Sequence, residues 1–596
     1  MEYPDYRLFD AIAYQLKHFE KPDALNAKIN GRWKPYSTKE VADMADKLSA
    51  GLLKKGVSGG HFTAESSDKI GIVSNSRPEW VITDLAVQQT GAILVPIYPT
   101  TNTLEMEYIL NQGEVKFLFV GNRELFEKAR AMNIPSLQSI YCFDEIAGCD
   151  HYSELIASAD ADSLEKVAEI KSHIPADHIA TIIYTSGTTG MPKGVMLSHA
   201  NIISNLFLVK AFFPYPEGRH LKMLSFLPLN HIFEKLGTYM YFFCGASIYY
   251  AENIDTIAND LLDIKPDSFT TVPRLLEKVY EKIMFKGASL KGIKRLLFFW
   301  SVRVGNKYNN RKKQGLFYHL QLRLARKLVF SKWREALGGN IKFIIAGGAA
   351  VPKRILRMFH AAGIPVYEGY GPTEHSPIIS ANRRVHNEVY FGTVGLPIDG
   401  VEVKLADDGE ILVKSPCVMK GYYKHPELTA EAIKEGWLYT GDVGKWVEGK
   451  YLKITDRKKE LFKTSGGKYV APQPIETRMK ESKFIEQILV VGNHRKFVGA
   501  LIVPTFEMVR EWLKEQNITT PMTNEEVIRH EEVQKLFHSV VAHHNRHFNH
   551  VEKIKKFELL PREWSIENGE MTPKLSPKRK VIEEKYKKQI ERIYGG

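Results

Sequence analysis

The sequence predicts an α/β fold: a large N-terminal domain of parallel α/β sheets that includes a β-rich subdomain, and a small mobile C-terminal α+β domain. The first observation is length, because 596 residues exceed what a single hydrophobic core supports. The second is an alternation of short apolar strands with helices, and the third is a change after Gly392 to short strands joined by tight turns. We expect an N-terminal domain at residues 1–458, with its β-rich subdomain at about residues 392–455, and a C-terminal domain at residues 459–596.

The first 60 residues predict a helix, short strands and a second helix, at whose start Ser37 and Glu40 have the spacing of a capping box. The elements that follow alternate strand and helix, as a parallel sheet with crossover helices requires. They are Lys69–Val73, Glu79–Gln88, Ala92–Pro96, Leu104–Asn111 and Val115–Val120. Four more predicted strands continue the pattern: Met223–Pro228, Ser247–Tyr250, Ser268–Val272 and Ile341–Ala346.

The β-rich subdomain is predicted to contain a hairpin, because Val401–Leu405 and Ile411–Lys414 flank an Asp-Gly turn. The charged stretch Asp456–Lys459 follows a further predicted strand, Leu452–Ile454. Its composition suits a linker and a solvated turn equally. We place the domain boundary at this stretch.

The composition, with 44% hydrophobic and 25% charged residues, is typical of a globular protein. No run of 18 apolar residues occurs, so no membrane-spanning helix is expected, and the first residues show no signal-peptide pattern. The four cysteines are scattered without CxxC spacing, so we expect neither a zinc site nor a disulfide framework. These features favour a cytoplasmic protein.

The net charge of +13 is concentrated in a basic and aromatic block at residues 278–334 and in the tail after Pro573. Most of these charges are expected on solvated helix faces. A sharper alternative is peripheral contact with anionic lipid at the inner face of the membrane. Nucleic acid is not expected as a partner, because no RNP or zinc-finger pattern occurs.

The stretch Tyr184–Gly194 predicts a polyphosphate-binding loop. It lies between a predicted buried strand, Ile179–Ile183, and residues 195–203, which predict the start of a helix. Its small and hydroxylated residues leave backbone N–H groups free to face an anion, and Lys193 adds a charge. The loop differs from the Walker A pattern, because Pro192 replaces a glycine and no Ser or Thr follows the lysine.

Four further stretches carry polar or small residues that suit a binding site: Leu227–Glu234, Ala346–Ala350, Tyr367–Glu374 and Gly436–Asp442 with Arg457. A histidine between apolar residues, such as His231, is more often a core residue, but its Pro and Asn neighbours indicate a strand end, where sites in parallel sheets lie. Glu374 can bind a divalent cation that phosphate oxygens share. Asp442 can accept hydrogen bonds from both hydroxyls of a ribose, and Arg457 can donate to the sugar or to a phosphate.

Together these stretches resemble the adenylate-forming, AMP-binding superfamily. The resemblance rests on the phosphate loop Tyr184–Gly194, the Tyr-Gly-x-Thr-Glu motif in Tyr367–Glu374, the Thr-Gly-Asp motif in Tyr439–Asp442, and the hinge Asp456–Lys459 with Lys459 at its pivot. Three features are similar to bacterial long-chain fatty-acid–CoA ligases: Leu227–Glu234, the basic insertion at about residues 280–335, and Asn568–Pro573 followed by Lys578 and Arg579.

The resemblance implies a two-step ligase that uses ATP and Mg²⁺. A long-chain fatty acid would first be converted to acyl-AMP with release of pyrophosphate, and transfer to CoA would then give acyl-CoA and AMP. For the phosphates the resemblance implies Thr185, Ser186, Gly187, Thr188, Thr189, Gly190 and Lys193, and for Mg²⁺ it implies Glu374 and Thr185. For the nucleoside it implies Gly348, Ala349, Gly369, Tyr370, Gly371, Thr373, Asp442 and Arg457, and His231 would lie near the reacting carboxylate.

One departure from the family pattern lies near the C-terminus. The lysine expected to neutralise the carboxylate and α-phosphate is replaced by Ser576, and Lys574, two residues earlier, would face the same side of an extended segment. The resemblance leaves two alternatives open, an enzyme that delivers its acyl group to a carrier protein and a catalytically impaired nucleotide-binding homologue. A homodimer is compatible with the sequence.

Overall fold

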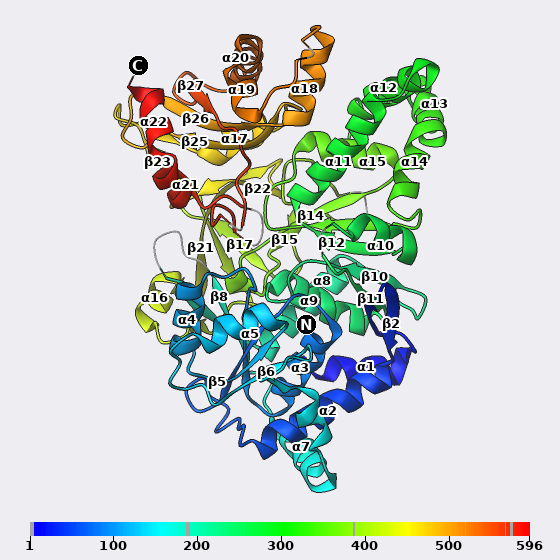
Figure 1. Ribbon diagram of the computed structural model, residues 1–596, viewed down its shortest axis with the longest axis vertical. Helices are drawn as coiled ribbons and strands as arrows, with labels where there is room; N and C mark the ends of the chain where they lie inside the picture. Colours follow the sequence, from blue (N-terminus) through cyan, green and yellow to red (C-terminus); the bar gives the residue numbers. More distant parts are fainter. Residues whose placement is uncertain are drawn as a thin grey trace.

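The computed structural model describes residues 5–185, 191–253, 255–384, 388–518, 520–566, 568–572 and 576–595. Figure 1 shows a large body that contains the N-terminal half of the chain and a smaller body that contains the C-terminal segments. The α/β fold class is confirmed, because the two largest sheets are mainly parallel and are accompanied by helices. None of the helices in the described part of the chain has the length and hydropathy needed to cross a membrane.

The first large sheet has eight strands in the order β19-β9-β8-β4-β3-β5-β6-β7, and its strands β3 to β8 run parallel. These strands are β3 (Lys69–Val73), β4 (Ile93–Ile97), β5 (Val115–Val120), β6 (Ser139–Cys142), β7 (Asp150–His151) and β8 (Ile179–Thr185). The antiparallel strands β9 (Lys193–Ser198) and β19 (Gly421–Tyr422) extend one edge. The helices of this part are α2 (Thr38–Lys54), α3 (Pro78–Gln89), α4 (Thr103–Gln112), α5 (Arg123–Arg130), α6 (Ser153–Ala157) and α7 (Ala161–His173).

The second large sheet has nine strands in the order β16-β15-β14-β13-β12-β10-β11-β1-β2. Its parallel strands are β1 (Leu25–Ile29), β10 (Lys222–Ser225), β11 (Ser247–Tyr250), β12 (Ser268–Thr271), β13 (Phe343–Ala346) and β14 (Val366–Tyr370). Antiparallel strands border it: β2 (Arg32–Tyr36), β15 (Ser380–Ala381) and β16 (Leu396–Pro397). The carboxyl ends of parallel strands meet at one edge of a sheet, so the loops after β10, β13 and β14 are neighbours.

The helices of this second part are numerous. They are α1 (Asp10–Phe19), α8 (His199–Phe212), α9 (Ile232–Phe243), α10 (Ile257–Ile264), α11 (Pro273–Ala288), α12 (Gly292–Asn306), α13 (Leu316–Ala325), the π-helical turn η1 (Arg326–Phe330), α14 (Ser331–Ala336), α15 (Lys353–Ala362) and the short turn η2 (Thr373–His375). In Figure 1, α12 and α13 project at the upper right of the large body. The predicted helix start at Ser37 is confirmed, because its side chain and that of Glu40 form a capping box.

A smaller antiparallel sheet links the two bodies. It contains β17 (Glu402–Leu405), β18 (Glu410–Lys414), β20 (Ile433–Lys434), β21 (Trp437–Val447) and β22 (Tyr451–Arg457), with helix α16 (Pro426–Ala432) beside it. The predicted hairpin is confirmed, because β17 and β18 pair antiparallel. Strand β22 ends at Arg457, and the chain then enters the smaller body.

The smaller body has its own apolar core, formed between Phe462 and Ile593. Its three-stranded sheet contains β25 (Ile485–Val491), β26 (Val498–Pro504) and β27 (Ile554–Leu559). The remaining elements are β23 (Phe462–Lys463), β24 (Tyr469–Val470), α17 (Pro472–Met479), α18 (Phe506–Glu515), α19 (Asn524–Arg529), α20 (Glu531–Asn545), α21 (Arg579–Lys585) and α22 (Lys587–Tyr594). A separate core is what an independently folding domain requires.

The prediction that residues 195–203 start a helix is wrong in its first part. Strand β9 pairs antiparallel with β8, with Ile183 opposite Val195, so the phosphate loop joins two strands. The helix begins only after Ser198, which caps α8 together with Asn201. Pairing with β8 buries Val195 and Leu197, and this outweighs local helix propensity.

The cysteine spacing predicts no disulfide framework, yet Cys142 and Cys149 are disulfide-bonded, with their Cα atoms 6.2 Å apart. The bond joins the end of β6 to the segment just before β7. Because β6 and β7 are adjacent parallel strands, the fold brings together two residues whose spacing carries no recognised motif. Cys244 and Cys417 are free and buried.

Candidate active site

Three of the predicted stretches meet at the carboxyl edge of the nine-stranded sheet. A Cβ atom placed on Gly347, after β13, would lie 3.3 Å from the ring of Phe233 and 3.7 Å from the carbonyl oxygen of Gly369. The stretch after β10, the stretch after β13 and the end of β14 therefore converge. Gly348 has a φ of +83°, which L side chains rarely adopt, so the turn after β13 favours glycine there.

The loop that carries His231 also contacts the eight-stranded sheet. The Ser76 hydroxyl, after β3, donates to the Leu227 carbonyl at 2.8 Å and accepts from the Leu229 N–H at 3.1 Å. His231 caps helix α9, because its Nδ1 accepts from the Phe233 N–H at 3.0 Å. The loop that carries His231 therefore contacts both large sheets, and His231 itself lies at the start of α9, six residues after β10 ends at Ser225.

Glu234, in the first turn of α9, is fully buried. The hydroxyls of Ser225 and Thr270 donate to its carboxyl group. Burial raises the pKa of Glu234 to about 7, because a charged carboxylate loses its hydration there. Its hydrogen bonds attach α9 to strands β10 and β12, so Glu234 holds the helix that begins at His231.

Asp442, Arg457 and Tyr370 form a second cluster, built from the small sheet and the end of β14. Asp442 and Arg457 are register partners on β21 and β22, and the Arg457 Nε lies 3.2 Å from Asp442 Oδ1. The Tyr370 hydroxyl donates to Asp442 Oδ2 at 2.8 Å. Burial raises the pKa of Asp442, while Arg457 and the Tyr370 hydroxyl oppose that increase. The sequence places these three residues far apart, and the fold brings them into contact.

Glu374 and Lys193 are joined through Tyr422, a residue that sequence reasoning missed. The Tyr422 hydroxyl donates to Glu374 Oε1 at 2.9 Å, and the Lys193 ammonium lies 5.3 Å from the centre of the Tyr422 ring. Burial and the Glu374 carboxylate raise the pKa of Tyr422, so its hydroxyl stays protonated and acts as the donor. Tyr422 belongs to β19, which pairs with β9, and this pairing brings it beside Lys193.

Two groups of predicted site residues lie outside the described residues. They are Ser186, Gly187, Thr188, Thr189 and Gly190 of the phosphate loop, and Lys574 near the C-terminus. The residues on either side of the loop are described: Thr185 ends β8 and is the register partner of Lys193. Ser576 is also described, and its N–H donates to the Thr572 hydroxyl at 3.1 Å.

Gly371 and Thr373 lie where the chain turns after β14. A Cβ atom on Gly371 would lie 1.6 Å from the Pro377 carbonyl oxygen, so only glycine fits. Thr373 begins the turn η2 that carries Glu374, and its side chain is buried. This close passage of two chain segments fixes the position of the Glu374 backbone. Ala349 follows Gly348 on the exposed side of the turn after β13.

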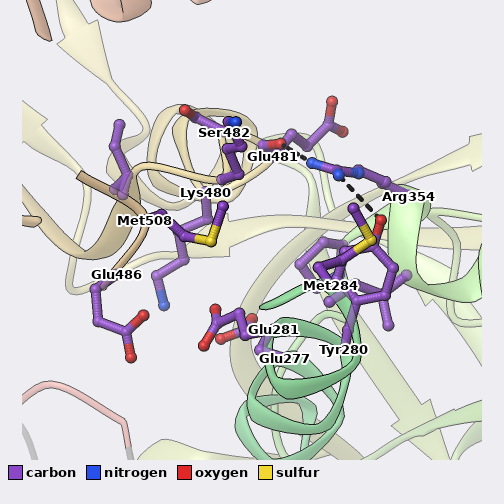
Figure 2. Close-up of a pocket in the computed structure, with 14 residues that line it drawn as sticks. Glu277, Tyr280, Glu281, Met284, Arg354, Lys480, Glu481, Ser482, Glu486 and Met508 are labelled. Atoms are coloured by element: carbon purple, nitrogen blue, oxygen red, sulfur yellow. Dashed lines mark hydrogen bonds between the residues drawn. The ribbon is translucent and has the colours of Figure 1, made fainter. Parts of the chain in front are cut away.

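The two bodies also contact each other at a pocket between α11, α15 and the C-terminal domain (Figure 2). There Arg354 donates to the Glu481 carbonyl at 3.1 Å and to the Tyr280 hydroxyl at 2.9 Å. Arg274 of α11 forms a buried ion pair with Glu486 of β25. Burial raises the pKa of Glu281, which also lines the pocket, to about 7. The pocket is lined by residues of both bodies, and none of the residues predicted from the motifs is among them.

Comparison with known proteins identifies the family. The model of the family described as AMP-binding enzyme matches residues 14–423, and that of its C-terminal domain matches residues 460–596. The chain belongs to the AMP-binding enzyme family. It is 32% identical over 578 residues to the long-chain-fatty-acid–CoA ligase FadD15 of Mycobacterium bovis, covering 95% of this chain and 93% of that protein.

Two further comparisons agree with this family. The long-chain-fatty-acid–CoA ligase 5 of Rattus norvegicus is 33% identical, with 95% of this chain and 85% of that protein covered. Among solved structures, the A domain of a carboxylic acid reductase from Segniliparus rugosus, in complex with AMP and a co-purified carboxylic acid, has a TM-score of 0.74 at 20% identity. That match covers 99% of this chain and 94% of the other, and it shows the shared fold.

AMP-binding enzymes of the ligase type use ATP, Mg²⁺ and CoA, and the described residues fit the first two. Asp442 and Arg457 offer a carboxylate and a cation beside Tyr370, which suits a nucleoside with its phosphates. Glu374 and Thr185 offer the hard oxygen ligands that Mg²⁺ takes together with substrate phosphates. Among the described residues no group of three or more His, Cys, Asp or Glu side chains could hold a metal ion. Bound Mg²⁺ neutralises phosphate charge.

Removing the Tyr422 hydroxyl is expected to loosen the Glu374 carboxylate. In Tyr422→Phe, the Mg²⁺ concentration for half-maximal pyrophosphate release should rise by about tenfold, because hydrogen bonds to charged groups contribute about 1.5–3 kcal/mol. The measurement is a Mg²⁺ titration at fixed ATP.

The neighbouring Tyr423 is the matched control for this variant. Its hydroxyl donates to Glu114 at 3.4 Å, whereas the Tyr422 hydroxyl donates to Glu374. Tyr423→Phe should leave the Mg²⁺ titration unchanged. An unchanged titration in Tyr422→Phe as well would contradict a positioning role for its hydroxyl.

Proposed function

We propose that this AMP-binding enzyme activates a long-chain fatty acid with ATP and transfers the acyl group to CoA. The support is twofold. Long-chain-fatty-acid–CoA ligases of bacteria and mammals resemble the chain over about 95% of its length. The observation that carries the chemistry is the contact of Asp442 with both Arg457 and Tyr370 beside the glycine-lined strand ends, which is a set of groups suited to adenosine.

In the first step, a fatty-acid carboxylate oxygen attacks the α-phosphorus of ATP. The bond from that phosphorus to the oxygen bridging the α- and β-phosphates breaks, and pyrophosphate leaves. Such a step depends mostly on positioning and on neutralising charge. Lys193 would hold the leaving pyrophosphate together with the phosphate loop, and Asp442 with Arg457 would hold the ribose. His231, at the start of α9, would lie beside the fatty-acid carboxylate.

In the second step, the CoA thiolate attacks the acyl carbonyl, the bond to the AMP oxygen breaks, and AMP leaves. The thiol proton is released to solvent. We propose that the domain after residue 458 turns about Lys459 between the two steps. Lys459 is exposed, whereas its neighbour Lys458 is held by Asp408 at 2.6 Å and Glu410 at 2.8 Å. Lys458, which these two carboxylates hold to the N-terminal domain, therefore immediately precedes Lys459, the proposed pivot.

The decisive experiment is a panel of carboxylates of increasing chain length in a pyrophosphate-release assay, with and without CoA. Palmitate with CoA should give acyl-CoA and AMP, and acetate and benzoate should not. Thioester formation with a phosphopantetheinyl carrier protein, but not with CoA, would favour the carrier-protein alternative. ATP binding without pyrophosphate release for any carboxylate would indicate the impaired homologue that Ser576 suggests.

The variant Lys574→Ala is expected to impair the first step alone. Lys574 is the proposed substitute for the lysine replaced by Ser576, so its loss should slow acyl-AMP formation by about 100-fold or more, as expected when a charge that acts in the transition state is removed. Thioester formation from supplied acyl-AMP should be retained. Both half-reactions are measured separately.

Lys578, on the same predicted side of the segment, is the control. Lys578→Ala should keep most of its adenylation activity. If Lys578→Ala loses adenylation and Lys574→Ala does not, the roles of the two lysines are exchanged and the assignment of Lys574 is wrong.

A further inference from the structure

Helix α13 and the turn η1 expose an unusual number of apolar side chains. Among the described residues, eight of the fourteen exposed large hydrophobic side chains lie between Phe285 and Leu328. Five of them follow one another at spacings of one, three or four residues along α13 and η1. We call these the apolar stripe: Leu316, Phe317, Leu320, Leu324 and Leu328. Residues at such spacings share one face of a helix, and Leu316 is 90% exposed.

The opposite face of the same helix is already packed. Leu322, Ala325 and Phe330 are buried in the core beside the nine-stranded sheet. A helix that is apolar on both faces requires a second apolar environment. The apolar stripe therefore stays exposed to solvent in the folded chain. Exposed apolar patches of this kind mark interaction sites. Ile293 and Leu296, both exposed, extend apolar character onto the neighbouring helix α12.

The segment of chain that carries the stripe is strongly basic, although its Arg311 pairs with Glu448 from another segment. Residues 282–334 contain fifteen Lys and Arg residues and no Asp or Glu. Arg323 and Lys327 lie one turn apart along one border of the stripe, and Lys312 and Lys313 precede its first residue. These four side chains are exposed and form no ion pair within the described part of the chain. Arg295, by contrast, lies 3.6 Å from Glu515 of α18.

We propose that the apolar stripe and its basic border bind the surface of a membrane that contains anionic lipid. Apolar side chains on one helix face with lysine and arginine beside them match an interface of acyl chains below negatively charged headgroups. A protein partner would have to be both apolar and acidic, and a second copy of this chain would bring the same positive charge against itself. Figure 1 shows that α12 and α13 lie at the periphery, where a flat surface can reach them.

The test uses the full-length protein without substrate, so that its outcome is independent of the proposed ligase activity. Binding is measured by flotation with vesicles of phosphatidylcholine alone and of phosphatidylcholine with phosphatidylglycerol. The wild type should bind the anionic vesicles, less at high salt, because exposed charges are screened. Leu316→Ser with Leu320→Ser, and separately Arg323→Glu with Lys327→Glu, should each lower the bound fraction by about tenfold.

Two matched double variants control for exposed apolar area and for net charge. Leu104→Ser with Leu262→Ser removes exposed leucines from α4 and α10, and Lys39→Glu with Lys166→Glu reverses exposed charges on α2 and α7. Both should bind vesicles as the wild type does. If the wild type does not bind anionic vesicles, or if the stripe variants bind as well as their controls, the proposal is overturned. A dimer that Leu316→Ser with Leu320→Ser dissociates, without change in vesicle binding, would also overturn it and assign the stripe to a second copy.

Discussion

Asp442→Asn is expected to lower kcat/KM for ATP by about 100-fold, which corresponds to about 2.7 kcal/mol, within the range for hydrogen bonds to a charged group. The asparagine keeps the size of the side chain but removes the charge that faces Arg457 at 3.2 Å. An asparagine also has only one acceptor oxygen. The ribose hydroxyls, the Tyr370 hydroxyl and Arg457 would all have to share that oxygen as donors. The measurement is the pyrophosphate-release rate as a function of ATP concentration.

Folding stability separates a binding role from a structural one in this variant. Burial raises the pKa of Asp442, so the charged carboxylate is held against a desolvation cost. Replacing it with a neutral amide should therefore leave Tm unchanged or slightly higher while ATP use falls. Asp408→Asn is the control, because Asp408 is an exposed carboxylate of the same sheet that pairs with Lys458. Loss of Tm in Asp442→Asn, with kcat/KM unchanged, would contradict the nucleotide-binding role.

Arg274→Met is expected to release the C-terminal domain from the arrangement seen here. Arg274 and Glu486 are both buried and pair across the two domains. Removing one partner of a buried pair leaves an uncompensated charge and costs about 3–5 kcal/mol. The hinge should then open more often, and trypsin cleavage at the exposed residues Arg457 to Lys459 should accelerate by about tenfold or more, because cleavage follows the population of the open form.

A double variant tests whether this effect comes from the unpaired charge. Arg274→Met with Glu486→Leu removes both charges, and replacement of a buried ion pair by apolar groups is often neutral or stabilising. Hinge cleavage in the double variant should therefore return towards the wild-type rate. The exposed pair Lys332–Glu335 is the control, because such surface pairs contribute only about 0–1 kcal/mol. Equal cleavage rates in the single and double variants would refute the role of the buried pair.

Much of the fold was predictable because its signals are local. The capping box at Ser37 depends on residues three apart, and the strands and helices from Lys69 to Val120 follow hydrophobic spacing within a few residues. The motif residues differ in this respect, because Glu374, Asp442 and Arg457 were assigned to one site through their resemblance to the AMP-binding family and not through local spacing. The sequence could not predict that the chain after the phosphate loop forms strand β9 before the helix begins. Local helix propensity in residues 195–203 competes there with pairing to β8.

The contacts that complete the site were decided only by the tertiary structure. Tyr422 lies in a short strand without a recognised motif, and it reaches Glu374 and Lys193 only because β19 pairs with β9. The bond between Cys142 and Cys149 and the pair of Arg274 with Glu486 likewise depend on strands and helices packing together. Residue type and spacing determine which side chains can do the chemistry. Their partners depend on distances between remote segments, which only the packing of the sheets and domains establishes.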